Sequence, residues 1–170
     1  TLLRRILAAA SDRSVVIVQI GFFTNLAHLL DRPPDGISAL SGGELVARKV
    51  RLLSVMAGAF QTVVDNNHYL EFNVRYDIPS AVQVARSWPT PIVWSGAETG
   101  LKVRFPARSV EYDFAHARRN PLKDAYQLYH PMPYERPTWD LTSSLYAVYP
   151  GRNYFTLSRP GWVTVEPDGF

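Results

Sequence analysis

The stretch EFNVRYD, residues 71–77, decides the fold and follows a strongly apolar run, Leu52–Met56, through the small residues Ala57–Ala59. An apolar run that ends in small residues is typical of a buried strand that opens into a loop at its carboxyl end. Open α/β sheets build their ligand sites at that end. Glu71 and Asn73 stand in this loop one residue apart, and a carboxylate beside a carboxamide suits the binding of vicinal hydroxyl groups. We therefore interpret the stretch as a sugar-binding loop.

Two other apolar runs predict the remaining strands of one sheet. Val15–Ile20 is rich in β-branched residues, the pattern of a parallel strand buried on both faces, and Pro91–Gly96 predicts a strand with its loop. Apolar residues at helical spacing predict helices at about residues 1–10, 24–30, 41–47 and 78–88. Strands that alternate with helices indicate an α/β fold, with a mostly parallel sheet and helices on both faces. We predict a single α/β domain over residues 1–170.

Polar residues at the expected helix starts predict how the helices are capped. Thr24 or Asn25 can cap the second helix, and Thr138 can cap a helix in the last third of the chain. Ser41 and Glu44 have the spacing of a capping box, in which the two side chains bond each other's backbone N–H groups.

The second half of the chain carries weaker signals. Residues 97–120 are expected to be irregular, with room for a short strand at residues 102–105, whereas residues 121–129 resemble a helix. Near the end of the chain, residues 154–157 and 162–165 predict the two strands of a hairpin.

The composition is that of a globular protein, because 46% of the 170 residues are hydrophobic and 12% are aromatic. The longest apolar runs, such as Val15–Ile20, are far shorter than a bilayer span, so we expect a soluble protein with no membrane partner. The sequence has no cysteine, which excludes disulfides, thiolate metal sites and a cysteine nucleophile.

The net charge of +3 is scattered along the chain rather than gathered in a stripe. The nearest approach to a basic cluster is Arg118-Arg119 beside His116, for which a solvated loop and a nucleic-acid contact are the alternatives. Because no basic stripe is interleaved with aromatic residues, we expect no nucleic-acid partner.

Polar residues follow the expected strands or begin the late helix, and they form the candidate ligand site: Thr24, Asn25, Asn66, Asn67, Glu71, Asn73, Ser95, Trp139 and Asp140. Asn25 and Asp140 also suit as helix caps, and that alternative stays open. Glu71 differs, because an acid between two apolar residues beside a sheet end should not be buried without a partner. For Glu71 and Asn73 together we favour a ligand site over a structural role.

Four segments of the chain resemble, in order, motifs of the inosine/uridine-type nucleoside hydrolases. Residues 21–27, GFFTNLA, resemble the family's Gly-Pro-Leu-Thr-Asn-Leu-Ala turn, and residues 55–59, VMAGA, resemble its Val-Met-Gly-Gly segment. Glu71-Phe72-Asn73 resembles its sugar-binding loop, and Trp139-Asp140 stands where the family has an aromatic residue or histidine before a metal-binding aspartate. The resemblance covers nearly the whole chain.

This resemblance implies a Rossmann-like fold and hydrolysis of the N-glycosidic bond of ribonucleosides, with a calcium ion that binds the ribose hydroxyls and the attacking water. Calcium takes about six to eight oxygen ligands. The resemblance assigns two of them to this chain, the backbone carbonyl of Thr24 and the carboxylate of Asp140. It places Met56 under the sugar and implies further substrate-binding roles for Glu71, Phe72, Asn73 and either Asn66 or Asn67.

Trp139 bears on the choice of substrate. Family members with histidine before the aspartate protonate the leaving base, whereas an indole there resembles the purine-preferring branch, in which stacking raises the basicity of the purine. The resemblance therefore implies catalytic roles for Trp139 and Asn73 and favours purine ribonucleosides. Ordinary aromatic packing at a helix start is the alternative for Trp139.

One element of the family pattern is missing. The family's first strand carries aspartates that supply calcium ligands and the general base, and Asp12, the nearest candidate, stands between a helix and a strand. By resemblance the chain begins roughly a hundred residues into the family pattern. We expect an unpaired sheet edge in such a fragment and a homo-oligomer for the intact protein. A non-catalytic ribose-binding or interaction module, and a structural domain in which Glu71 and Asp140 are caps, are the alternatives.

Overall fold

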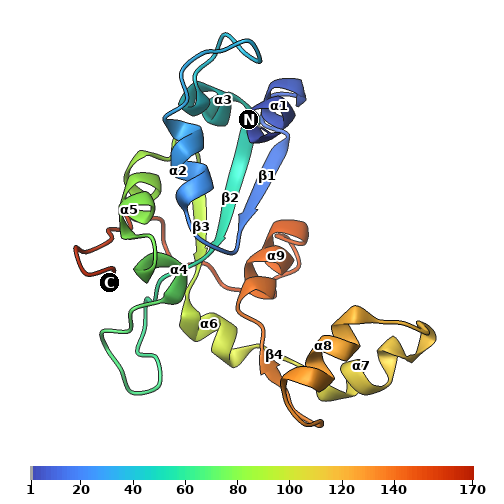
Figure 1. Cartoon of the computed structure of the whole chain (residues 1–170). Helices are drawn as coiled ribbons and strands as arrows, with labels where there is room; N and C mark the ends of the chain where they lie inside the picture. The colour runs from blue at the N-terminus through green and yellow to red at the C-terminus, as the bar shows by residue number, and fades with distance from the viewer. Residues whose placement is uncertain (1) are drawn as a thin grey trace.

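The computed structural model describes residues 2–170, and its centre is a three-stranded parallel sheet (Figure 1). The middle strand is β2 (Val50–Met56), which pairs with β1 (Val15–Gln19) on one side and with β3 (Ile92–Ser95) on the other. The α/β class and the parallel sheet are confirmed. The strand that leads to residues 71–77 is therefore the central one.

Helices connect the strands much as predicted. Those that surround the sheet are α1 (Leu2–Ala9), α2 (Thr24–Leu30), α3 (Gly42–Lys49), α4 (Phe72–Arg75), α5 (Ile78–Ser87) and α9 (Asp140–Val148). The short α4 was not predicted and begins inside the stretch that was read as a loop. Within residues 2–170, none of the helices combines the length and the apolar character that crossing a bilayer requires.

One face of the sheet carries the main hydrophobic core. Leu53 and Val55 of the central strand are fully buried there, and α1, α2, α3 and α5 contribute Leu7, Leu26, Val46 and Val84 among others. Because side chains alternate along a strand, the neighbouring Ser54 and Met56 point to the opposite face. The loops that leave the carboxyl end of the sheet therefore begin at strands that are fixed by core packing.

The opposite face is covered by α9, which packs across the sheet (Figure 1). Ser54 Oγ donates to the carbonyl of Ser143 at 2.9 Å, and Ser95 and Thr142 bond through their hydroxyls. Helices on both faces are thereby confirmed. Burial of β1 on both faces is wrong, because β1 lies at an edge of the sheet and Val18 is 38% exposed.

The predicted caps are only partly right. The capping box of Ser41 and Glu44 is present with both reciprocal bonds. The other caps are wrong: the N-cap of α2 is Phe23 and that of α9 is Trp139, and neither makes a side-chain cap bond. Thr24 is drawn away by a tertiary partner, and Thr138 donates its hydroxyl to Val103 instead.

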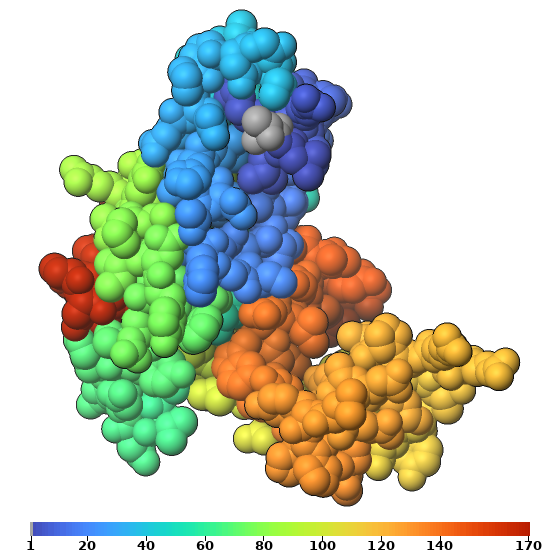
Figure 2. Space-filling model, viewed as in Figure 1, coloured from blue at the N-terminus to red at the C-terminus, as the bar shows by residue number. Residues whose placement is uncertain are grey.

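Residues 97–120 are more regular than predicted. They form α6 (Ala97–Lys102), β4 (Arg104–Phe105), α7 (Ala107–Glu111) and a 3₁₀ turn (Asp113–His116), which precede the correctly predicted α8 (Pro121–Tyr129). β4 pairs antiparallel with β5 (Arg136–Pro137), so the chain returns beside the point where it left. Figure 2 shows this excursion as a lobe that projects from the body, coloured yellow to orange.

The predicted C-terminal hairpin is wrong, because residues 149–170 form no strand. An isolated two-stranded hairpin is marginal in water without a third strand or a helix to pack against. The two segments instead separate: Tyr154–Leu157 lie near α9, whereas Trp162–Glu166 lie near the loop after β2. Figure 1 places the end of the chain beside α4 and α5.

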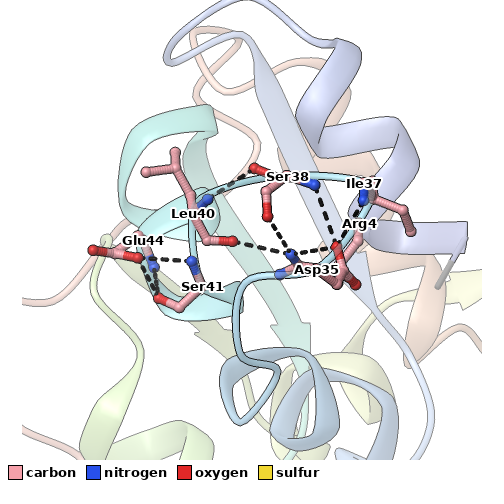
Figure 3. Close-up of polar contacts among 7 residues, drawn as sticks. All are labelled: Arg4, Asp35, Ile37, Ser38, Leu40, Ser41 and Glu44. Carbon is pink, nitrogen blue, oxygen red and sulfur yellow. Dashed lines mark hydrogen bonds and ion pairs between the residues drawn. The ribbon is translucent and has the colours of Figure 1, made fainter.

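A buried arginine ties α1 to the loop between α2 and α3 (Figure 3). Arg4 is 1% exposed, and its guanidinium donates to both carboxylate oxygens of Asp35 at 2.9 and 3.0 Å and to the carbonyls of Ser38 and Leu40. Asp35 also accepts from the backbone N–H of Ile37. These hydrogen bonds, that from Arg4 foremost, hold the pKa of Asp35 down at about 2.

The geometry of this pair predicts an asymmetry between two substitutions. Asp35→Ala leaves a buried guanidinium without its carboxylate, whereas Arg4→Met leaves a carboxylate that water can reach. We expect Asp35→Ala to lower the melting temperature more, by on the order of 5 °C beyond Arg4→Met, in thermal unfolding followed by circular dichroism. Because the Asp35 pKa is lowered by folding, the difference should be present above about pH 4 and fade as pH falls toward 2. Equal losses at pH 7 would contradict this account.

Candidate functional site

Five of the predicted site residues come together at the carboxyl end of the central strand: Met56, Glu71, Asn73, Trp139 and Asp140. The amide nitrogen of Asn73 donates to the carbonyl of Met56 at 3.0 Å and lies 3.5 Å from its sulfur. Met56 and Trp139 belong to one apolar cluster with Val63 and Ala97. The site is thus shared between the loop after β2 and the start of α9.

Glu71 is the N-cap of α4 and is only 4% exposed. One carboxylate oxygen accepts from the backbone N–H of Asn73 at 3.0 Å, and the other accepts from Val74 and Gly58, each at 3.2 Å. The acid is therefore buried with partners, as electrostatics requires. The capping bonds explain why Glu71 is buried, and they also fix the backbone at Asn73, from which the amide side chain extends.

The two carboxyl groups of the site are both hard to ionise. Burial raises the pKa of Glu71, the three N–H donors oppose that rise, and the charge of Asp140 adds to it. Burial also raises the pKa of Asp140. Within residues 2–170 neither group forms an ion pair with a basic side chain. The site therefore concentrates negative charge that a bound cation would stabilise.

Trp139 has a strained backbone, with φ at 26°. A residue other than glycine rarely adopts a positive φ, and such residues cluster at functional sites. Gly100 makes the conformation fit, since a Cβ at this glycine would come within 2.4 Å of the Trp139 Cα. On the indole side, the guanidinium of Arg136 lies 5.6 Å from the ring centroid and 4.1 Å from that of Tyr129.

Thr24 begins α2 at the carboxyl end of β1, and its hydroxyl donates to the carboxylate of Asp77. Burial pushes the pKa of Asp77 up, but the hydrogen bonds from Thr24 and Ser80 outweigh it, and the pKa falls below its ordinary value. The bond joins the starts of α2 and α5. The first turn of α2 is thereby fixed beside the loop that holds Glu71.

Three other predicted site residues make their side-chain contacts elsewhere. The side chains of Asn66 and Asn67 are exposed, and their amide oxygens accept within their own loop, from the backbone of His68 and from Thr62. Phe72 is 59% exposed and stacks on Phe22, with 5.8 Å between ring centroids.

Glu98 is a buried acid that the sequence reasoning missed. It is 7% exposed, follows Gly96-Ala97 at the end of β3, and accepts from the backbone N–H of Phe60 at 3.3 Å. Glu71 accepts from the N–H of Gly58 and Glu98 accepts from that of Phe60, so two buried carboxylates bind the loop after β2 at positions two residues apart. The signal was the one used for Glu71, an acid after small residues at a strand end, but residues 97–120 were read as irregular.

The donors for a metal ion are incomplete in the described chain. Within residues 2–170 no three Asp, Glu or His side chains are grouped in a way that could hold a metal ion. Asp12 is turned to other partners, since Arg48 and Lys49 bond its carboxylate at 2.9 and 2.8 Å. The residues described here do not by themselves fit a complete calcium shell of about six to eight oxygens.

The fold and the site define an α/β protein of the Rossmann-like class, with its polar residues at the carboxyl end of a parallel sheet. The sequence model of the family described as inosine-uridine preferring nucleoside hydrolase matches residues 1–169, and the chain belongs to that family. The resemblance seen in the four sequence motifs is thereby confirmed. A search of curated proteins gave no match. Family membership implies nucleoside hydrolase activity in broad terms.

The raised pKa of Asp140 predicts that this residue costs stability. Its ionisation is disfavoured in the folded protein, so folding is weakened above the folded pKa and unaffected below about pH 4, where both states are protonated. Asp140→Asn should therefore raise the free energy of unfolding at pH 7 by about 1 kcal/mol or less, and leave it unchanged near pH 3. Urea unfolding at both pH values tests this, and a less stable variant at pH 7 would favour a stabilising role for Asp140 at the helix start.

Proposed function

We propose that the chain carries the sugar- and base-binding part of a nucleoside hydrolase, which cleaves the N-glycosidic bond of ribonucleosides to ribose and free base. Purine ribonucleosides are the proposed substrates. The observation that carries the proposal is the grouping of Glu71, Asn73 and Met56 on one side with Trp139 and Asp140 on the other. Three separate sequence segments meet there only in the folded chain.

The charge of the site suits this reaction. Cleavage of an N-glycosidic bond develops positive charge on the sugar ring, as in glycoside hydrolysis, and acidic groups held around the ring stabilise that charge. Glu71 and Asp140 are close enough for the charge of one to raise the pKa of the other. Their mutual repulsion in the free protein would be relieved as the positive sugar forms.

Asn73 is oriented for a sugar hydroxyl. Its amide nitrogen is taken by the Met56 carbonyl, and its backbone N–H is taken by Glu71. The amide oxygen is the atom left to accept from a ligand, and the side chain is 7% exposed, so its rotamer is held by packing. A preorganised acceptor of this kind is what binding of ribose requires.

Trp139 is proposed to stack on the leaving purine. The strained backbone and the close fit against Gly100 hold the indole in one orientation, which is the property that a stacking residue needs. Trp139 precedes Asp140 directly, so the same turn would place base and sugar recognition side by side.

Calcium is proposed as the cofactor, with the carboxylate of Asp140 and the backbone carbonyl of Thr24 as two of its ligands. The desolvated, unpaired carboxylate of Asp140 fits this role, but the full donor set does not lie within residues 2–170. The proposal therefore requires further oxygen ligands and the general base from outside the described residues. Bound calcium would supply an activated water.

A non-catalytic ribose-binding module is the second candidate. It is favoured by one observation: the nearest acid to the sheet's amino-terminal side, Asp12, is paired with Arg48 and Lys49 and cannot serve as a base. Such a module would keep Glu71 and Asn73 for ribose but would not turn over a nucleoside.

Substitution of Asp140 or Asn73 tests the proposed activity. We expect Asp140→Ala and Asn73→Ala each to lower kcat/KM for inosine by about 100-fold or more, because each removes an interaction with the reacting sugar. The measurement is release of hypoxanthine in the presence of calcium, with calorimetric titration of calcium and ribose beside it.

Asp124→Ala is the matched control, since Asp124 is also an acid in the first turn of a helix but is exposed to solvent. It should retain the wild-type rate. Inosine binding that depends on Asn73 without any turnover would select the non-catalytic module, and absence of both binding and turnover would reject the two candidates together.

Gly100→Ala tests the position of Trp139 without touching the indole itself. The new methyl group must displace the Trp139 backbone, so we expect a loss of roughly 100-fold in purine nucleoside hydrolysis with the fold retained. Gly151→Ala is the control, because a Cβ there meets nothing within 4 Å. An unchanged rate in the folded Gly100→Ala variant would speak against base stacking by Trp139.

A further inference from the structure

A second cavity lies beside the candidate site and is not part of it. It has a volume of about 450 Å³, within the range of small-molecule sites, and lies between the loop that begins at Gly58 and the C-terminal residues 162–170. Its lining includes Val74 and Trp94 but none of the five residues that meet in the candidate site.

The cavity adjoins the candidate site but has a lining of its own. Trp94 packs on the main core, 5.9 Å from Phe23, whereas its neighbour Ser95 bonds to α9 on the other face of the sheet. Ala59 and Tyr69 line the cavity and also pack against the cluster that holds Met56 and Trp139. The Gly58 backbone, whose N–H bonds to Glu71, lies where the cavity and the candidate site meet.

Aromatic residues make up much of the cavity lining. Phe60 and Trp94 meet edge to face with 6.4 Å between ring centroids, and Tyr69 and Phe170 belong to the same lining. Trp162 also lines the cavity and is 95% exposed, so it lies at the rim, where its indole is accessible to a planar ligand.

Polar side chains also line the cavity and can form hydrogen bonds with the edge of a planar ligand. Gln61 and Asn67 contribute amides, and Thr164 and Glu166 contribute a hydroxyl and a carboxylate. Amides and carboxylates bond to the amino groups and ring nitrogens of nucleobases, and aromatic side chains stack on their faces. No lysine or arginine lines the cavity, which argues against a phosphate or another anion.

The walls of the cavity are joined before any ligand binds. His68 lies in the loop after β2, bonds to Asp168 at 2.6 Å, and stacks on Phe170 with 4.4 Å between ring centroids. The turn at residues 166–170 is closed by two backbone bonds between Glu166, Gly169 and Phe170. The two sides of the cavity therefore hold each other in place, which lowers the cost of ordering them around a ligand.

We propose that this cavity is a binding site for a free nucleobase, with Trp162 as the stacking residue at its rim. The inference rests on the cavity and its lining and does not depend on hydrolysis by the neighbouring site. It adds a second place for a planar heterocycle, separated by the Gly58 backbone from the place where a nucleoside would be cleaved.

Calorimetric titration of adenine into three proteins tests the proposal: the wild type, Trp162→Ala and Tyr112→Ala. Trp162 can be removed with little risk to folding because it is almost fully exposed. We expect Trp162→Ala to weaken adenine binding by about tenfold or more, the loss of one stacked base. Tyr112 is 68% exposed and lies outside the cavity lining, so Tyr112→Ala should bind like the wild type.

Two outcomes would overturn the proposal. Adenine that fails to bind the wild type would remove the site, and adenine binding that Trp162→Ala leaves at wild-type strength would assign the base to another part of the molecule. Because titration requires no turnover, a protein that binds adenine through Trp162 yet hydrolyses no nucleoside would uphold this site while rejecting the proposed function.

Discussion

The structure at the carboxyl end of the sheet depends on one buried carboxylate. Glu71 accepts three backbone N–H groups, and these belong to the two ends of the loop between β2 and α4. Without it, the short α4 would lose its cap, and a four-residue helix has little other means of stability. The position of Asn73, the path of the Gly58 backbone and the boundary between the candidate site and the neighbouring cavity all follow from this carboxylate.

The same carboxylate sets the chemistry that the site can perform. A carboxylate held by three dipoles stays fixed while a ligand binds, so its charge is available without rearrangement. Asp140 belongs to the same site but has no such donors, and its pKa is raised by burial alone. The two acids therefore have different roles. Glu71 caps α4 and also belongs to the site, whereas Asp140 has no basic partner within the described residues. An unpaired, partly buried carboxylate lowers stability, and such costs are typical of functional sites.

The sequence was most informative where one face of an element had to be buried. The sequence predicts the three strands, α5 and the capping box at Ser41 correctly. In each of them the spacing of apolar residues or a hydrogen bond between near neighbours is enough to determine the local structure. The grouping of Glu71, Asn73 and Trp139-Asp140 was predictable through family motifs. Residues 97–120 and the C-terminal segment failed for a shared reason: their conformation is set by distant partners, such as Thr138 on Gly100, that no local pattern encodes. The strained φ of Trp139 was invisible for the same reason, whereas Glu98 carried the same local signal as Glu71, an acid after small residues at a strand end.

The projecting lobe leaves and rejoins the body almost at one point. Thr138 N–H donates to the carbonyls of Gly100 and Val103, and β4 pairs with β5, so the ends of the excursion are fastened together. An insertion closed in this way can be lengthened, shortened or exchanged over evolution without moving the sheet. Its return strand, however, carries Arg136 against the Trp139 ring. Exchange of the lobe would therefore alter the surroundings of the indole while leaving Glu71 and Asn73 in place. Under the proposed function, relatives could in this way diversify in base selectivity alone.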